Sequence, residues 1–155
     1  MAVFSVAKGL RQSNLTKLQW RQISLERRHL WVAAEDHKNG KAHAVRLNEA
    51  AMQVLQKRRG DHLTHVFTYE GKPIVQVNAK AWRAALKRAG IEDFRWHDLR
   101  HTFATWHRQA GTPTRELQRL GGWRTLEMVE RYAHVAPEGL QVAASRLDNV
   151  LTGTF

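Results

Sequence analysis

The order of strand-forming and helix-forming segments is the feature that most constrains the fold of this chain. Residues 18–22 and 29–33 are strand-like runs, separated by a short polar turn. The dipeptide Asn39-Gly40 follows them, and Asn-Gly is the strongest two-residue hairpin signal because both positions tolerate positive φ. Residues 43–47 then supply the returning strand. The first third of the chain therefore predicts a small antiparallel sheet of three strands.

The rest of the chain predicts helices. Their expected ranges are residues 48–59, 79–89, 96–110, 113–121, 125–132 and 137–150. The boundaries follow from residues such as Asn48, an N-cap, Gly111, a C-terminal stop, and Pro113 at a favoured first position. Residues 61–77 are expected to be irregular, with residues 66–69 as either a short strand or a buried loop, and the opening residues are expected to be the tail end of a helix. The predicted fold class is mainly α with a small three-stranded antiparallel β-sheet.

The composition favours one domain with a polyanionic partner. The 155 residues include 25 Lys and Arg against 14 Asp and Glu, a formal net charge of +11. Such a balance points first to nucleic acid and second to an anionic membrane surface. The absence of Cys excludes disulfides and thiolate zinc sites and is compatible with a reducing cytoplasm. No apolar run approaches the ~20 residues of a membrane helix.

The segment from His97 carries the first candidate site residues. Residues three and four apart share a helical face, so His97, Arg100 and His101 lie on one stripe. Leu99 and Trp106 lie on another stripe, which we expect to be buried while the imidazole and guanidinium face outward. Arg offers a planar fork of donors and His can exchange a proton, so the pair suits a phosphate. The alternative is an ordinary solvated polar face.

Four further residues are candidates only in combination. Tyr132 would be a nucleophile, although a phenol with an ordinary pKa of about 10 needs cationic neighbours to activate it. Trp123 would lie near it, Arg11 would precede the first strand and Lys38 would lie beside the hairpin tip. Taken one at a time, these residues are more readily explained as packing aromatics or solvated charges.

Together, the motifs resemble those of the tyrosine recombinase family of the phage integrase type. The matching segments are Gly9-Leu10-Arg11, Lys38 in the hairpin, His97-x-x-Arg100, Leu120-Gly121-Gly122-Trp123 and Tyr132-Ala133-His134. Two positions depart from the commonest pattern: Trp123 stands where many members have His, and Asn14 stands where many have an acidic residue. The resemblance covers nearly the whole chain and implies the catalytic-domain fold of DNA breaking-rejoining enzymes.

The resemblance also implies a metal-independent and cofactor-free chemistry. Arg11 and Arg100 would bind the non-bridging phosphate oxygens, helped by His97 and Trp123. Tyr132 would attack the phosphodiester and form a covalent 3′-phosphotyrosine. Lys38 would protonate the departing 5′ oxygen as the general acid. The implied function is site-specific DNA recombination or integration, and the implied localisation is cytoplasmic, bacterial or phage, and nucleoid-associated.

Double-stranded DNA is the implied partner, with Lys41, Lys80 and Arg83 as candidate phosphate contacts or, equally, plain solvated charges. The intact enzyme is expected to act as a homo-oligomer, a tetramer on DNA. Residues 137–150 would either dock on a neighbouring subunit or fold back on their own core. Relatives carry a core-binding domain before the first Arg box. We therefore expect residues 1–155 to be a catalytic-domain fragment truncated at the N-terminus.

Three alternatives remain open at this point. The chain could be a catalytically impaired DNA-binding remnant of an integrase. It could be a type IB topoisomerase, which uses a similar set of side chains. It could also be a His-rich metal protein, because His97 and His101 have the i, i+4 spacing of a helical zinc pair, but no Glu adjoins His97 and we predict no metal.

Overall fold

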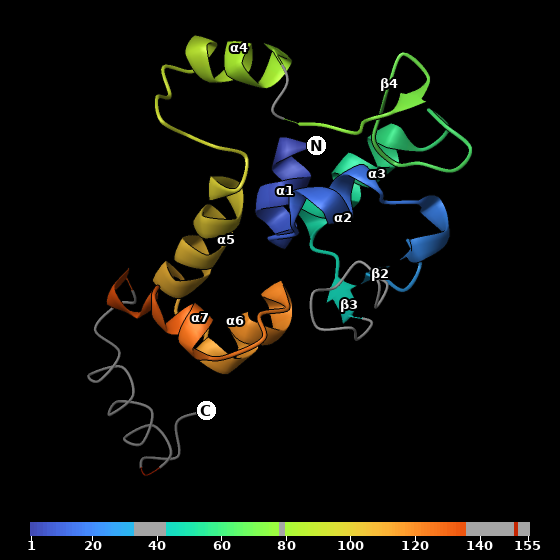
Figure 1. Cartoon of the computed structure of the whole chain (residues 1–155). Helices are drawn as coiled ribbons and strands as arrows, with labels where there is room; N and C mark the ends of the chain where they lie inside the picture. The colour runs from blue at the N-terminus through green and yellow to red at the C-terminus, as the bar shows by residue number, and fades with distance from the viewer. Residues whose placement is uncertain (33–42, 78–79, 136–150, 152–155) are drawn as a thin grey trace.

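A computed structural model describes residues 1–32, 43–77, 80–135 and 151 of the chain. The fold is mainly helical with a small antiparallel sheet, as predicted (Figure 1). The helices are α1 (Ala2–Lys8), α2 (Gln12–Thr16), α3 (Glu49–Arg58), α4 (Lys80–Arg88), α5 (Asp98–Gln109), α6 (Thr114–Gly121) and α7 (Glu127–Glu130), with short 3-10 turns η1 (Trp20–Gln22) and η2 (Ala133–Val135). The strands are β1 (Ile23–Ser24), β2 (His29–Val32), β3 (His43–Arg46), β4 (Thr68–Tyr69) and β5 (Lys72–Pro73).

The first sheet has the predicted three antiparallel strands in the order β1-β2-β3. Within β2, Leu30 is buried and its neighbour Trp31 is largely exposed, as expected for a sheet with one covered face. The predicted strand over residues 18–22 is wrong in part. Side chain–backbone hydrogen bonds between Gln19 and Gln22 close a capping box there, so the backbone turns before the short strand β1 begins. The hairpin tip at residues 33–42 lies outside the described residues.

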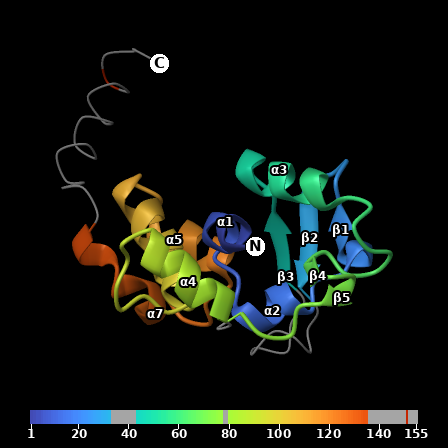
Figure 2. The same cartoon turned by 90° about the horizontal axis from the view of Figure 1, so that it is seen from above.

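Helix α1 lies in the middle of the molecule. It packs against α3 on one side and α5 on the other, and Figure 2 shows the sheet on the α3 side. Phe4 of α1 is fully buried, and its ring lies edge-on to Phe67 with the centroids 5.5 Å apart. This helix therefore joins the sheet half of the molecule to the helical half that follows it.

Two clusters of buried apolar side chains result. The larger cluster surrounds α1, α3 and the first sheet and extends to Leu99 at the start of α5. The smaller cluster consists of Phe103, Ala104, Leu117, Val129 and Tyr132. Helix α5 contributes to both clusters, so side chains between Leu99 and Phe103 lie at the boundary between the two.

The helical predictions are confirmed with small changes at the ends. Asn48 caps α3 by accepting a 3.2 Å hydrogen bond from the backbone N–H of Ala51. Pro113 is the N-cap of α6 and not its first residue. The helix expected over residues 125–132 is only the short α7, so Tyr132 lies in the turn between α7 and η2. The helix expected at residues 137–150 lies outside the described residues, and none of the described helices is long and apolar enough to cross a membrane.

Candidate active site

Arg100 is the centre of the candidate site, and it is buried. Only 6 % of its surface is exposed, whereas Trp106 on the stripe expected to be buried is 59 % exposed. The expectation for α5 is therefore confirmed only in part: Leu99 and Phe103 of the apolar stripe are buried, but Trp106 is exposed, and Arg100 on the other stripe is buried instead of solvated. Tertiary packing overrides the pattern because α1 and α6 close over the Arg100 side of α5, where two backbone carbonyls receive the guanidinium.

The guanidinium of Arg100 is held on three sides. Its Nη1 donates to the carbonyl of Gly9, and its Nη2 donates to the carbonyl of Gly121 at 2.7 Å. Its carbon Cζ lies 4.1 Å from the centroid of the Trp123 ring, which is a cation–π contact. A buried guanidinium with fixed donors is well suited to present its remaining N–H groups to an anion.

The two glycines make these contacts possible. Gly9 ends α1 with φ +60°, and a Cβ there would overlap the ring of Phe103. A Cβ on Gly121 would overlap the ring of Trp123. Both positions therefore need a residue without a side chain, so that the backbone carbonyls can approach Arg100.

Arg11 places a second positive charge near Arg100. It is half-buried and is the N-cap residue of α2, two residues after Gly9. Burial, with a smaller contribution from the charge of Arg11, lowers the pKa of Arg100 to about 10, while Tyr132 acts in the opposite direction. Arg100 is thus still charged at neutral pH, and two cations face the same region.

Tyr132 faces the same group of side chains. It is 7 % exposed, and its hydroxyl lies 2.5 Å from Nδ1 of His101. Its ring centroid is 6.3 Å from that of Trp123. Burial raises the pKa of the Tyr132 phenol, an effect that the positive charges of Arg131 and Arg100 partly oppose. The structure therefore brings Arg11, Arg100, Trp123 and Tyr132 together, as the motifs predicted.

His97 completes this group from the N-cap position of α5. Its ring centroid is 5.2 Å from that of His101, in an edge-on arrangement. Burial lowers the pKa of His97, and the neighbouring His101 and Arg100 lower it further. A neutral imidazole at this position can donate one hydrogen bond and accept another.

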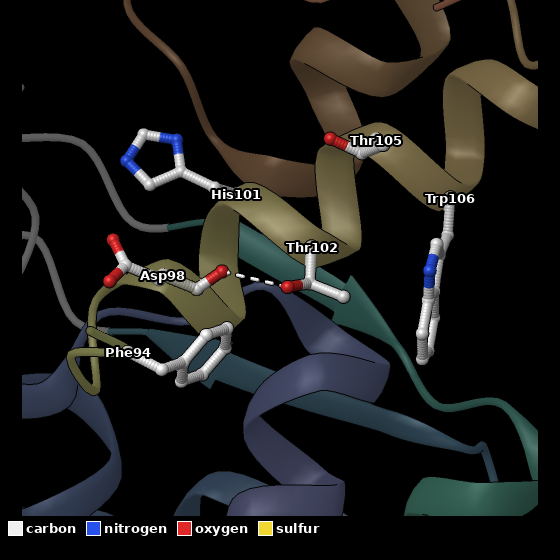
Figure 3. Close-up of a pocket in the computed structure, with 6 residues that line it drawn as sticks. All are labelled: Phe94, Asp98, His101, Thr102, Thr105 and Trp106. Atoms are coloured by element: carbon white, nitrogen blue, oxygen red, sulfur yellow. Dashed lines mark hydrogen bonds between the residues drawn. The ribbon is translucent and has the colours of Figure 1, made fainter. Parts of the chain in front are cut away.

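The contact between His101 and Tyr132 was not predicted. The sequence shows that His97 and His101 share one helical face, but it cannot show which residue from α7 meets that face. His101 also lines one edge of a pocket of about 410 Å³ along α5, with its ring turned away from Phe94 and Trp106 (Figure 3). Thr102, farther along the pocket, donates to the carbonyl of Asp98 at 2.9 Å.

The remaining candidate residues are not brought into this group. Lys80 and Arg83 are exposed on α4, which lies apart from α6 and α7 in Figure 1. Lys38 and Lys41 lie outside the described residues. Within the described ranges, no three His, Asp or Glu side chains gather as a bound metal ion would require.

Comparison with known proteins identifies the family. The profile of the phage integrase family matches residues 1–138. The chain belongs to the phage integrase family. The integrase of Salmonella phage P22 is 46 % identical over 160 aligned residues, which cover 95 % of this chain and 41 % of that protein. A shufflon-specific DNA recombinase of Escherichia coli is 32 % identical, covering 82 % of this chain and 32 % of its own length. This integrase-family chain therefore spans less than half of either relative.

Solved structures support the fold. The catalytic domain of bacteriophage HP1 integrase superposes with a TM-score of 0.67 and 24 % identity, covering 93 % of this chain and 79 % of that domain. The recombinase XerH, in a post-cleavage complex with a palindromic difH substrate, gives a TM-score of 0.71 and 22 % identity over 95 % of this chain and 44 % of that chain. The catalytic-domain fold of tyrosine recombinases is thus shared at low sequence identity.

Proposed function

We propose that this chain is the catalytic domain of a site-specific tyrosine recombinase, which cleaves and rejoins DNA through a covalent 3′-phosphotyrosine at Tyr132. The observation that carries the proposal is the contact of one buried, charged guanidinium, that of Arg100, with the ring of Trp123, which in turn lies beside Tyr132. The carbonyls of Gly9 and Gly121 and the ring of Trp123 fix this guanidinium, so its remaining N–H groups can bind a phosphate.

In this proposal the phosphodiester lies against Arg100 and Arg11. Negative charge develops on the non-bridging oxygens as the nucleophile attacks, and fixed N–H donors stabilise that charge without having to reorganise. Arg100 is fixed by the carbonyls of Gly9 and Gly121. His97 and the indole N–H of Trp123 are proposed to add hydrogen bonds to the same oxygens.

Attack by Tyr132 forms the bond from its oxygen to phosphorus and breaks the bond from phosphorus to the 5′ oxygen. Lys38 is proposed to supply the proton that the 5′ oxygen gains. A second 5′-hydroxyl can then attack the phosphotyrosine and restore the phosphodiester on a new strand. The cationic side chains perform the charge stabilisation that a metal ion performs in other phosphoryl transfers.

Double-stranded DNA is the proposed partner. The net charge of +11 favours it, and a Tn1549 transposon integrase of related fold was solved in complex with circular intermediate DNA. Lys41, Lys80 and Arg83 are proposed phosphate contacts, and a homo-tetramer is the proposed assembly on DNA. The cytoplasm, on nucleoid or phage DNA, is the proposed place of action.

A suicide-substrate assay tests the proposal. The chain is mixed with a pool of duplexes of randomised sequence that are nicked on one strand, and detergent-resistant complexes are recovered and sequenced. We expect a covalent band for wild type and none for Tyr132→Phe. The matched control is Tyr69→Phe, which removes the only other tyrosine of the sequence from an exposed position and should retain the band.

Two outcomes contradict the proposal. A band that survives Tyr132→Phe would show that another residue is the nucleophile. DNA binding by wild type without any covalent band would favour the alternative of a catalytically impaired DNA-binding remnant.

A further inference from the structure

His101 makes a hydrogen bond to Tyr132 that the proposed mechanism does not use. Its Nδ1 lies 2.5 Å from the phenol oxygen, and the two ring centroids are 5.9 Å apart. We propose that His101 is the base that accepts the proton of Tyr132 as that oxygen attacks phosphorus. This inference rests on the proposed function of the site.

Among the side chains around the Tyr132 phenol, His101 is the one best able to accept its proton. Arg100 and Arg131 also influence Tyr132, but a guanidinium has no lone pair with which to accept a proton. His97 stacks edge-on against His101, and among the described residues it makes no hydrogen bond to Tyr132. When His101 is neutral and carries its proton on Nε2, its Nδ1 lone pair faces the phenol directly.

Tyr132 needs such a base because it is buried. Its phenol is 7 % exposed and its pKa is raised, so little phenolate exists at neutral pH. A base within hydrogen-bond reach removes the proton during attack and avoids the cost of forming free phenolate first. Nδ1 of His101 lies 2.5 Å from the Tyr132 hydroxyl without DNA, so the base is already within hydrogen-bond reach.

The charge that His101 gains is compensated by a neighbour on the same helix. Asp98 lies one turn earlier on α5, and its pKa is lowered mainly by the hydrogen bond from the Arg95 side chain, with a last and smallest contribution from the charge of His101. Asp98 is held by Arg95, whose Nη2 donates to its Oδ1 at 3.0 Å. The charges of His97 and His101 oppose each other, and after burial this interaction is the next cause of the lowered pKa of His97.

The proton balance is complete with residues of this chain. In cleavage, the bond from the Tyr132 oxygen to phosphorus forms, the bond from phosphorus to the 5′ oxygen breaks, and the phenol proton moves to Nδ1 of His101. The 5′ oxygen receives a different proton, from Lys38 in the proposed mechanism. In rejoining, the attacking 5′-hydroxyl gives its proton to the neutral Lys38, the bond from the Tyr132 oxygen to phosphorus breaks, and the Tyr132 oxygen recovers its proton from His101.

The test compares single-turnover cleavage of the duplex selected in the suicide-substrate assay. His101→Asn places an amide oxygen near the position of Nδ1, so it can accept the hydrogen bond but cannot take up the proton. We expect cleavage to slow by about 100-fold or more, the usual contribution of a general base. His107→Asn is the matched control, because His107 lies on the same helix and bonds to Thr112 at 3.0 Å instead of to Tyr132.

A second substrate distinguishes the proposed role of His101 as the base from that of Lys38 as the acid. With sulfur in place of the bridging 5′ oxygen, the leaving group departs as a thiolate and needs no proton. Lys38→Ala should then recover most of its activity, whereas His101→Asn should stay slow. Added imidazole should restore part of the rate of His101→Gly, which a purely structural role of the side chain would not allow.

Nitrogen NMR of the imidazoles gives a reading that needs no DNA. We expect His101 of the wild-type chain to be the Nε2–H tautomer with a hydrogen-bonded Nδ1, and expect Tyr132→Phe to lose that hydrogen bond. An Nδ1–H tautomer in the wild-type chain would overturn the proposal even if every His101 variant failed to fold.

The outcomes distinguish this inference from the proposed function. A wild-type covalent band together with His101→Asn cleavage at nearly the wild-type rate overturns the role of His101 and leaves the recombinase function standing. Absence of a wild-type band on both substrates overturns the function, and the role of His101 as its base with it.

Discussion

The two apolar clusters of this protein differ in size and in what they support. The larger one includes α1, α3 and the first sheet, and its members, such as Leu55, are packed from several elements. The smaller one has five buried residues, and one of them is Tyr132. The proposed nucleophile thus belongs to the cluster with fewer supporting contacts, whereas the carbonyl of Gly9 that holds Arg100 follows a helix of the larger one.

Arg100 joins these two regions. Its hydrogen bonds reach Gly9, at the end of α1, and Gly121, at the end of α6. A phosphate site that depends on this residue can form only when the two regions are packed together. The geometry of the site therefore depends on how the smaller cluster packs onto the larger one.

Removal of the Arg100 side chain is expected to have the largest effect on stability, because Arg100 joins the two clusters. Arg100→Met leaves the carbonyls of Gly9 and Gly121 without their donors, and we expect the free energy of unfolding to fall by about 4 kcal/mol. Urea unfolding measures this change. Arg95→Met, at an exposed position just before the same helix, is the control and should change the stability little. Equal effects of the two variants would show that Arg100 does not join the regions.

Truncation of one leucine in each cluster tests whether the two clusters unfold separately. Leu55 and Leu117 are both fully buried, so each change to Ala should cost about 3 kcal/mol. Far-ultraviolet circular dichroism, which reports helix content, and the covalent-adduct assay follow the consequences. We expect Leu117→Ala to weaken the adduct while most of the helical signal remains, and Leu55→Ala to lower the midpoint of the whole transition. Loss of both signals together in Leu117→Ala would show that the two clusters unfold as one unit.

Substitution of Lys8 is expected to change the free energy of unfolding least, and it should stabilise the protein where the preceding variants destabilise it. Its side chain is 5 % exposed, makes no hydrogen bond or ion pair to the other described residues, and has its pKa lowered by burial from 10.5 to about 8. The folded state therefore binds this proton less well than the unfolded state, and the charge destabilises the fold. Lys8→Met should raise the free energy of unfolding at pH 7 by about 2 kcal/mol.

The pH dependence of this effect follows from the sign of the shift. The penalty is fully present below pH 8 and disappears as the pH rises to 10.5, because both states are then neutral at this position. Wild type should therefore gain stability relative to Lys8→Met across that window, as measured by urea unfolding at several pH values. Lys57→Met at an exposed position of α3 is the control. A constant difference between wild type and Lys8→Met would contradict the shifted pKa of Lys8.

Local signals in the sequence determined the helices and the three-stranded sheet. Asn48 caps α3 and Gly9, Gly111 and Gly122 lie in the left-handed region near helix ends, because these preferences act over a few neighbouring residues. The motifs around Arg11, Arg100 and Tyr132 also predicted the family, which the comparisons confirm. The strand at residues 18–22 failed because a side-chain capping box replaced the extended backbone.

Only the tertiary structure decided which face of α5 is buried and which residue meets Tyr132. The helical spacing places His97, Arg100 and His101 on one face, but burial of Arg100 depends on carbonyls that lie 91 and 21 residues away in the chain. The bond between His101 and Tyr132 likewise spans 31 residues. Such contacts depend on how helices pack, and helix packing is set by shape and by the pairing of buried polar groups over the whole domain, which periodicity alone does not contain.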